Sequence, residues 1–250
     1  MKLILSPTKT MAVAPSGGHG QDTGEPDFFP QALALNQRLA ALSSDGLKKL
    51  FNTSETLTLK AMEQIRQFET APAGPAIFAF RGEAFKALDP ESLTREALVF
   101  AQSHLRICSG LYGLLRPLDG IRPYRLDLAT PLRVDGQGLT AFWKPWVVPW
   151  LAEQMALDEP LLNLASEEYA ALFRGSVLAD RMITLSFKEK ADSTLKINSV
   201  RAKQARGLFA RAVIQGRIQA PDDLKDVSIQ GYEYSTPLSD SREWVFLCRS

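Results

Sequence analysis

Short apolar runs typical of buried strands alternate along this chain with segments whose apolar residues recur at helical spacing. The strand-like runs cover residues 2–5 (KLIL), 76–80 (AIFAF), 161–164 (LLNL), 177–187, 194–198 and the C-terminal EWVFLCR. Helical spacing covers residues 31–70, 91–108 and 199–215. The pattern predicts an α+β or mixed α/β fold in one domain over residues 1–250, with a central sheet flanked by helices. It does not predict the regular strand–helix–strand alternation of a Rossmann sheet.

Composition excludes several classes of protein. With 45% hydrophobic residues the chain can bury a sizeable core, so global disorder is excluded. No apolar run approaches the roughly 20 residues of a membrane-spanning helix, and the N-terminal apolar stretch is shorter than the roughly 7–15 residues of a signal peptide. Cys108 and Cys248 form no disulfide framework, and with His19 and His104 they form no metal-ligand spacing. We therefore expect a cytoplasmic, monomeric protein without metal or cofactor.

Positive charge is concentrated in one segment of a nearly neutral chain. The formal net charge is +1, yet residues 188–217 hold eight basic and two acidic side chains, a local charge of +6. The helix expected at 199–215 places Lys203, Arg206 and Arg211 opposite its apolar side. Localised charge of one sign suits an anionic partner, whereas a solvated helix face is the alternative interpretation.

The stretch 103–128 (SHLRICSGLYGLLRPLDGIRPYRLDL) predicts a phosphate-contacting turn. We expect the helix that begins near residue 91 to end at Ser109, and Gly110–Gly113 to form the turn of a helix-hairpin-helix-like element over about 91–122. Glycines in such a turn let backbone N–H groups approach a phosphate closely. The arginines that would surround the phosphate are Arg106, Arg116, Arg122 and Arg125. The alternative is a structural turn whose arginines pair with Asp119 and Asp127.

No standard catalytic motif accompanies these basic residues. The chain has no phosphate loop and no GxGxxG, and a Ser–His–Asp site would have to use His19 or His104. Glu167 and Glu168 after Ser166 resemble the first turn of a helix and are weaker candidates for catalytic carboxylates. The residues of a possible anion pocket are Ser6, Lys9, Ser109 and Tyr112, together with basic residues of the 199–215 helix.

Several segments, in order along the chain, resemble the YaaA peroxide-stress resistance family. They are LILSPTKT at 3–10, AFRGEAF at 79–85, HLRICSGLYGLLRPLDGIRPYRLDL at 104–128, NLASEEY at 163–169 and KQARGLFARAVI at 203–214. The segment 174–182 departs from the family pattern because it carries fewer lysines, which weakens the expected basic cleft. The resemblance implies a mixed fold with a positively charged cleft and a helix-hairpin-helix element.

The same resemblance implies a cytosolic protein of the hydrogen peroxide response that binds DNA and lowers unincorporated iron, so that DNA and protein are spared. Ferritin-type Glu-x-x-His pairs are absent from the sequence, so we expect the effect on iron to be indirect. We expect binding through the DNA backbone and shape, not through base sequence. The alternative is an enzyme whose basic cleft acts on a small anionic or nucleotide-like substrate. A groove as wide as a duplex would favour DNA, and a pocket of roughly 300–1,000 Å³ would favour the small ligand.

Overall fold

The computed structural model describes residues 1–12, 23–191 and 194–249, so the loop expected from residue 14 lies partly outside the described residues. The helices are α1 (Phe29–Ala40), α2 (Ser44–Phe51), α3 (Glu55–Arg66), α4 (Ala76–Ala79), α5 (Glu83–Leu88), α6 (Arg95–His104), α7 (Leu139–Glu153), α8 (Glu167–Ala170) and α9 (Ser199–Gly216). The strands are β1 (Lys2–Leu5), β2 (Gly74–Pro75), β3 (Leu105–Ser109), β4 (Gly113–Leu115), β5 (Gly120–Ile121), β6 (Arg133–Val134), β7 (Gln137–Gly138), β8 (Leu161–Leu164), β9 (Met182–Ala191), β10 (Thr194–Lys196), β11 (Tyr232–Tyr234) and β12 (Glu243–Arg249).

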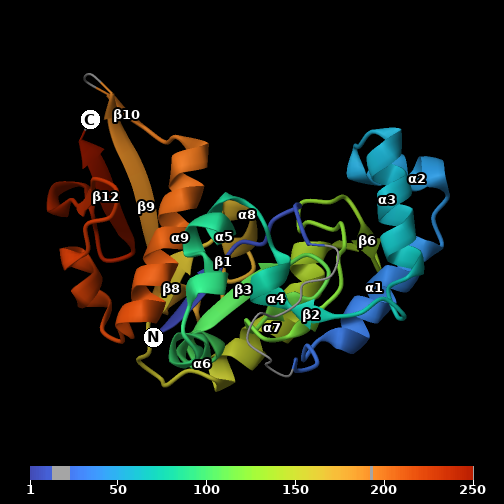
Figure 1. Ribbon diagram of the computed structural model, residues 1–250, viewed down its shortest axis with the longest axis horizontal. Coiled ribbons are helices and arrows are strands. Elements are labelled where there is room, and N and C mark those ends of the chain that lie inside the picture. The colour runs from blue at the N-terminus through green and yellow to red at the C-terminus, as the bar shows by residue number, and fades with distance from the viewer. Residues whose placement is uncertain (13–22, 192–193, 250) are drawn as a thin grey trace.

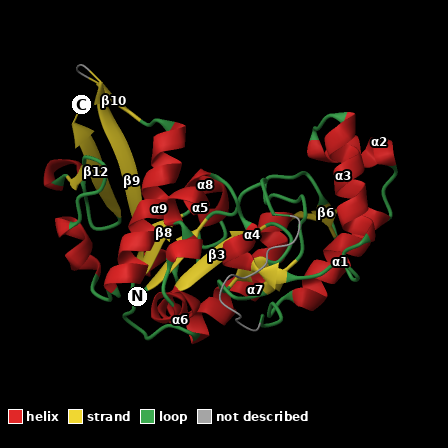
Figure 2. Cartoon of the chain, in the orientation of Figure 1, coloured by secondary structure: helices red, strands yellow, loops and turns green. Residues whose placement is uncertain are grey.

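A mixed sheet forms the centre of the molecule, which confirms the expected α/β fold with flanking helices (Figure 2). Five of its strands run parallel in the order β3-β1-β8-β9-β12. Antiparallel strands border them: β4 beside β3, β11 beside β12, and β10 beside the end of β9. The last three residues of β1 and all of β8 are buried, as expected for parallel strands covered on both faces.

The parallel strands follow a doubly wound order that the sequence pattern did not reveal. Numbered along the chain, their order across the sheet is 2-1-3-4-5, because β3 lies on one side of β1 and β8 lies on the other. Sheets of this order bind ligands outside the carboxyl ends of the two strands where the connections diverge. In this protein those strands are β1 and β8, and the fold therefore directs attention to the residues after Leu5 and Leu164.

Two helical groups lie at opposite ends of the molecule, on either side of the inner strands β1, β3 and β8 (Figure 1). The helices α1, α2 and α3 form one end, and α9 lies with β9 and β12 at the other. Helix α9 confirms the amphipathic helix expected over 199–215. Its Phe209 packs on Phe187 of β9 and Phe246 of β12, with ring centroids 5.0 and 4.5 Å apart.

Two expected elements are wrong. Residues 76–79 form the short helix α4, not a strand, and the helix expected over 91–108 ends at His104. Residues Leu105–Ser109 instead form β3, which is buried throughout and pairs with β1. Tertiary pairing with the central strand therefore overrides the helical spacing at this point.

A β-hairpin replaces the expected helix-hairpin-helix-like element. The strands β3 and β4 pair antiparallel around Gly110–Gly113, so the turn joins two strands and does not follow a helix. Gly113 has a φ of +71°, and a Cβ atom there would lie 2.6 Å from the Trp143 ring. The glycine is thus required by a left-handed backbone packed against an indole. None of the helices within the described residues is both long and apolar enough to cross a membrane.

Candidate anion-binding pocket at the sheet switch point

A pocket of about 830 Å³ lies where β1 and β8 end, at the point that the strand order indicates. The segment after β1, residues 6–10, and the segment after β8, which includes Ser166 and Glu168, both line it. Further lining comes from the start of α5, from Asp127 and from Lys203 and Arg206 of α9. Side chains from five separate parts of the sequence therefore converge in one recess.

Two serines that line this pocket tie the ends of the central strands together. The backbone N–H of Ser166 donates to Ser6 Oγ at 2.8 Å, and Ser6 Oγ lies 3.3 Å from Ser166 Oγ. Because Ser6 accepts from the Ser166 backbone and donates to the Ser166 hydroxyl, the Ser166 hydroxyl proton is left to donate elsewhere. The pair holds one hydroxyl donor at the carboxyl ends of both strands.

The wall formed by α5 and α9 is held together by unusually close backbone contact. A Cβ atom added at Gly207 would lie 1.9 Å from the Ala84 carbonyl oxygen, so only glycine permits this approach. Gln204 Nε2 donates to Glu83 Oε2 at 2.7 Å across the same contact. Lys203 and Arg206 are three residues apart on α9, so they share the helix face that lines the pocket.

Arg206 carries a charge without a partner. Its side chain is partly buried, yet its guanidinium makes no hydrogen bond or ion pair with any described residue, and its Nε atom is buried without an acceptor. Burial lowers the pKa of Arg206, which reflects the free-energy cost of holding the cation away from water. Buried polar groups are nearly always satisfied in folded proteins. An anion in the pocket would give the Arg206 guanidinium a charged partner.

Carboxylates line the pocket as well. Asp127 Oδ2 pairs with Lys9 Nζ at 2.9 Å, and Asp127 Oδ1 accepts a long hydrogen bond from the Tyr169 hydroxyl at 3.4 Å. Burial, ahead of the nearby hydroxyl and acidic groups, raises the pKa of Tyr169, so the phenol stays protonated and donates. Glu168 Oε1 accepts from the Ala129 N–H at 2.8 Å. The site is therefore not uniformly basic.

The structure brings five sequence-predicted residues into this pocket and places the other candidates elsewhere. The five are Ser6, Lys9, Glu168, Lys203 and Arg206. Ser109, expected in the same pocket, is fully buried with its Oγ 2.7 Å from the Tyr124 hydroxyl. Tyr112, also expected there, is buried and accepts a hydrogen bond from the Arg122 N–H. Both residues stabilise the polypeptide after β3.

Arg106 is a structural residue. Its side chain is 2% exposed, and its guanidinium donates to the carbonyl oxygens of Gln102 and Leu105 and to Gln154 Oε1, at 2.7–3.0 Å. It also lies over the Trp150 ring at 5.4 Å. Burial, followed by repulsion from Arg116, lowers its pKa to about 10. Phosphate contact requires a side chain at the surface. The prediction that Arg106 contacts phosphate is therefore wrong.

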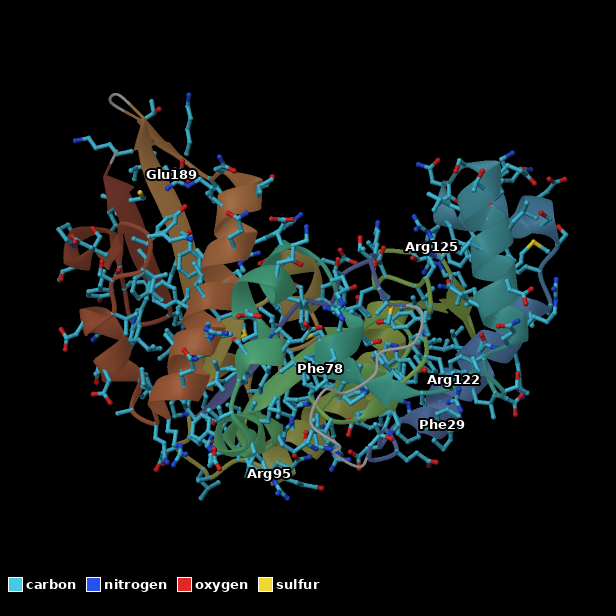
Figure 3. The ribbon with its side chains drawn as sticks, in the orientation of Figure 1. Phe29, Phe78, Arg95, Arg122, Arg125 and Glu189 are labelled. Carbon is cyan, nitrogen blue, oxygen red and sulfur yellow. The ribbon has the colours of Figure 1, made fainter. Side chains whose placement is uncertain are left out.

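Three further arginines expected at a phosphate donate to protein acceptors. Arg116 pairs with Asp27 at 2.8 Å and Asp119 at 3.1 Å. Arg122 donates to the Ala71 carbonyl at 2.6 Å and lies over Phe29 (Figure 3). Arg211 donates to the carbonyl oxygens of Leu88 and Asp89.

Arg125 differs from these three arginines. It makes no hydrogen bond or ion pair within the described part of the chain and lines a small hollow with Lys9 and Lys60. Figure 3 shows it apart from Arg122, toward α3.

The Gly110–Gly113 turn does not present backbone N–H groups to a ligand. A Cβ atom at Gly110 would lie 2.2 Å from the Leu126 carbonyl oxygen, and the Gly110 carbonyl accepts from Trp143 Nε1 at 2.9 Å. Neither glycine lines the pocket that Arg206 lines. The turn packs against protein on both sides, so the expectation that its glycines let backbone N–H groups approach a phosphate is wrong.

Sequence reasoning missed the contributions of Asp127 and the segment 81–86 to the pocket, and it named Glu168 only as a candidate carboxylate without placing it beside Arg206. A signal for part of the site was present, because polar residues follow two buried strand-like runs, as SPTKT after KLIL and SEEY after the run 161–164. Carboxyl ends of neighbouring parallel strands meet at one edge of a sheet. Without the strand order, however, these two segments cannot be placed together.

Comparison with known proteins places the chain in one family. The family model described as "Peroxide stress protein YaaA" matches residues 1–238. A UPF0246 protein of Desulforapulum autotrophicum is 41% identical over the whole of both chains. UPF0246 proteins of Acaryochloris marina and of Janthinobacterium sp. are 37% and 36% identical, over 100% and 98% of each chain. The chain belongs to the YaaA peroxide stress protein family.

Proposed function

We propose that this protein is an enzyme of the peroxide stress response. Its substrate, a small anionic or nucleotide-like molecule, binds in the switch-point pocket. The observation that carries the proposal is the partly buried, unpartnered guanidinium of Arg206 in that pocket. Any lowering of unincorporated iron would follow indirectly from this activity, because the described residues contain no group of three or more His, Cys, Asp or Glu side chains that could hold a metal ion.

The shape and chemistry of the site support a small ligand. A volume of about 830 Å³ falls within the range of small-molecule sites. Charge-assisted hydrogen bonds to phosphate or carboxylate are the strongest that a guanidinium makes. The Ser166 hydroxyl and the Lys203 ammonium line the same recess and would add donors to the same anion.

Binding to DNA is the second candidate, and one observation favours it. Lys9 lines both the pocket and the small hollow that contains Lys60 and Arg125, so basic side chains continue from one recess to the next. A nucleic acid backbone following this line would contact Lys203, Arg206, Lys9 and Arg125. Each phosphate contact that is removed should reduce the slope of log affinity against log salt by about one unit.

Calorimetric titration with ethyl phosphate separates the pocket from general surface charge. Arg206→Met should weaken binding at least about tenfold, because a hydrogen bond to a charged group is lost. Arg201→Met is the matched control: Arg201 lies on the same helix, pairs with Glu189 at 3.2 Å and does not line the pocket. It should change the affinity less than about twofold, since exposed ion pairs contribute little. Equal effects of the two substitutions would contradict the proposal.

Arg125→Met and Arg206→Met together test the DNA candidate. Fluorescence anisotropy of a labelled duplex, measured over a range of salt concentrations, gives the affinity and its salt slope. If DNA follows both the pocket and the small hollow beside it, Arg125→Met and Arg206→Met should each weaken binding and each lower the slope by about one unit. If Arg206→Met loses ethyl phosphate binding but keeps its DNA affinity and salt slope, the result would favour the small-ligand proposal.

A further inference from the structure

We propose that Glu168 selects ligands that carry a hydrogen-bond donor, a hydroxyl or an ammonium group, beside their anionic group. This inference rests on the proposed function, since it assigns chemistry to the part of the ligand that Arg206 does not bind. The shared chemistry is an anion with a neighbouring O–H or N–H donor. Phosphorylated polyols and phosphorylated amines both meet this description.

Glu168 has one carboxylate oxygen in use and one free. Oε1 accepts from the Ala129 N–H at 2.8 Å, which fixes the side chain. Oε2 has no hydrogen-bond partner among the described residues, and no described cation pairs with Glu168. The residue lines the same pocket as Arg206 and follows the Ser166 donor by two positions. An oriented acceptor with open capacity therefore lies in the pocket.

The other pocket carboxylates are occupied. Glu83 receives Lys86 Nζ at 2.9 Å on one oxygen and Gln204 Nε2 at 2.7 Å on the other. The oxygens of Asp127 receive Lys9 and Tyr169. Among these three carboxylates, only Glu168 has an oxygen without a hydrogen-bond partner among the described residues.

The free charge of Glu168 has opposite effects on two classes of ligand. It repels a bare anion held at Arg206, because both negative charges lie in one pocket that is partly shielded from water. A hydroxyl or ammonium group that donates to Oε2 replaces this repulsion with a charge-assisted hydrogen bond. The pocket should therefore bind a donor-bearing phosphate ester more tightly than an alkyl phosphate of the same size.

Matched pairs of probes measure this preference by calorimetry. The pairs are O-phosphoethanolamine with ethyl phosphate, for the ammonium group, and glycerol 1-phosphate with propyl phosphate, for the hydroxyl groups. In at least one pair the wild-type protein should prefer the donor-bearing member by about tenfold. The pair with the larger preference identifies the ligand class. Glu168→Gln should reduce the preference to about twofold or less, because the substitution removes the charge and replaces Oε2 by a donor.

Glu167→Gln is the matched control, since Glu167 precedes Glu168, pairs with Arg174 and does not line the pocket. This variant should retain the wild-type preference. Equal affinities within both pairs for wild type, or a preference that survives Glu168→Gln, would overturn the inference and leave Arg206-dependent binding of ethyl phosphate intact. If none of the four probes binds, or if Arg206→Met leaves their affinities unchanged, the proposed function and the inference are both overturned.

Discussion

The hairpin region 104–128 and the switch-point pocket both contain a partly or fully buried arginine, and they use it in different ways. Arg106 in the hairpin region donates through two of its three guanidinium nitrogens to protein acceptors. Arg206 in the pocket donates to no described residue. Burial lowers the pKa of both groups, so the pKa shift alone does not distinguish them. The number of guanidinium nitrogens that donate to protein acceptors does distinguish them. It indicates that Arg206 is the arginine with donors open to a ligand.

The largest expected effect tests the structural nature of the hairpin region. Trp143→Ala should lower the free energy of unfolding by about 3–5 kcal/mol, because a fully buried indole and its hydrogen bond to Gly110 are lost. Trp146→Ala, on the same helix but 46% exposed, should cost less than about 1 kcal/mol. Urea unfolding of the two variants measures both values. Similar small losses would show that the hairpin is not packed as described.

Replacement of each arginine by methionine compares the two regions directly. Arg106→Met should lower the free energy of unfolding by about 2–3 kcal/mol, because the acceptors on Gln102, Leu105 and Gln154 lose their donor. Arg206→Met removes a charge without a protein partner and should leave stability unchanged or raised. Urea unfolding decides between these outcomes, and a large loss for Arg206→Met would mean that this residue is structural too.

Gly207→Ala should distort the pocket because it disrupts the contact between α5 and α9, which form one of its walls. The added Cβ would overlap the Ala84 carbonyl, so α5 and α9 must separate, at a cost of about 1–3 kcal/mol. Ethyl phosphate affinity should fall in the same variant because Arg206 moves with α9. Gly138→Ala is the control, since the nearest neighbour of its new Cβ would be the end of the Arg133 side chain, 4.0 Å away. A stable Gly207→Ala protein with wild-type affinity would contradict the described wall.

The smallest expected effect is a pH dependence in the hairpin region. His104 Nδ1 lies 2.8 Å from the Met1 carbonyl oxygen, and burial lowers the pKa of the ring below its ordinary value of 6.5. As pH falls through 6.5 the unfolded chain takes up a proton before the folded protein does, so stability decreases on acidification and is fully present above that range. The difference in unfolding free energy between pH 7.5 and pH 5.5 should be smaller in His104→Gln. Ethyl phosphate affinity should not change with this substitution, and a loss of affinity would link His104 to the site.

The sequence predicted the fold class because strand runs and helical spacing are local properties. Helix α9 and the final strand are where their patterns indicated. Residues 105–109 were misassigned because their pairing with β1 is a long-range contact that no local pattern contains. The basic residues of α9 were identified from charge, but the role of Arg106 was misjudged, since sequence does not show which guanidinium is already satisfied. Glu168 and Asp127 required the strand order to be placed near Arg206 at all.

A crystal structure of the protein grown with tungstate, a heavy analogue of phosphate, tests the central claim most directly. The account predicts an oxyanion in the switch-point pocket, within hydrogen-bond distance of the Arg206 guanidinium and the Ser166 hydroxyl. An empty pocket in crystals whose tungstate lies elsewhere, or a guanidinium of Arg206 turned to a protein acceptor, would contradict it.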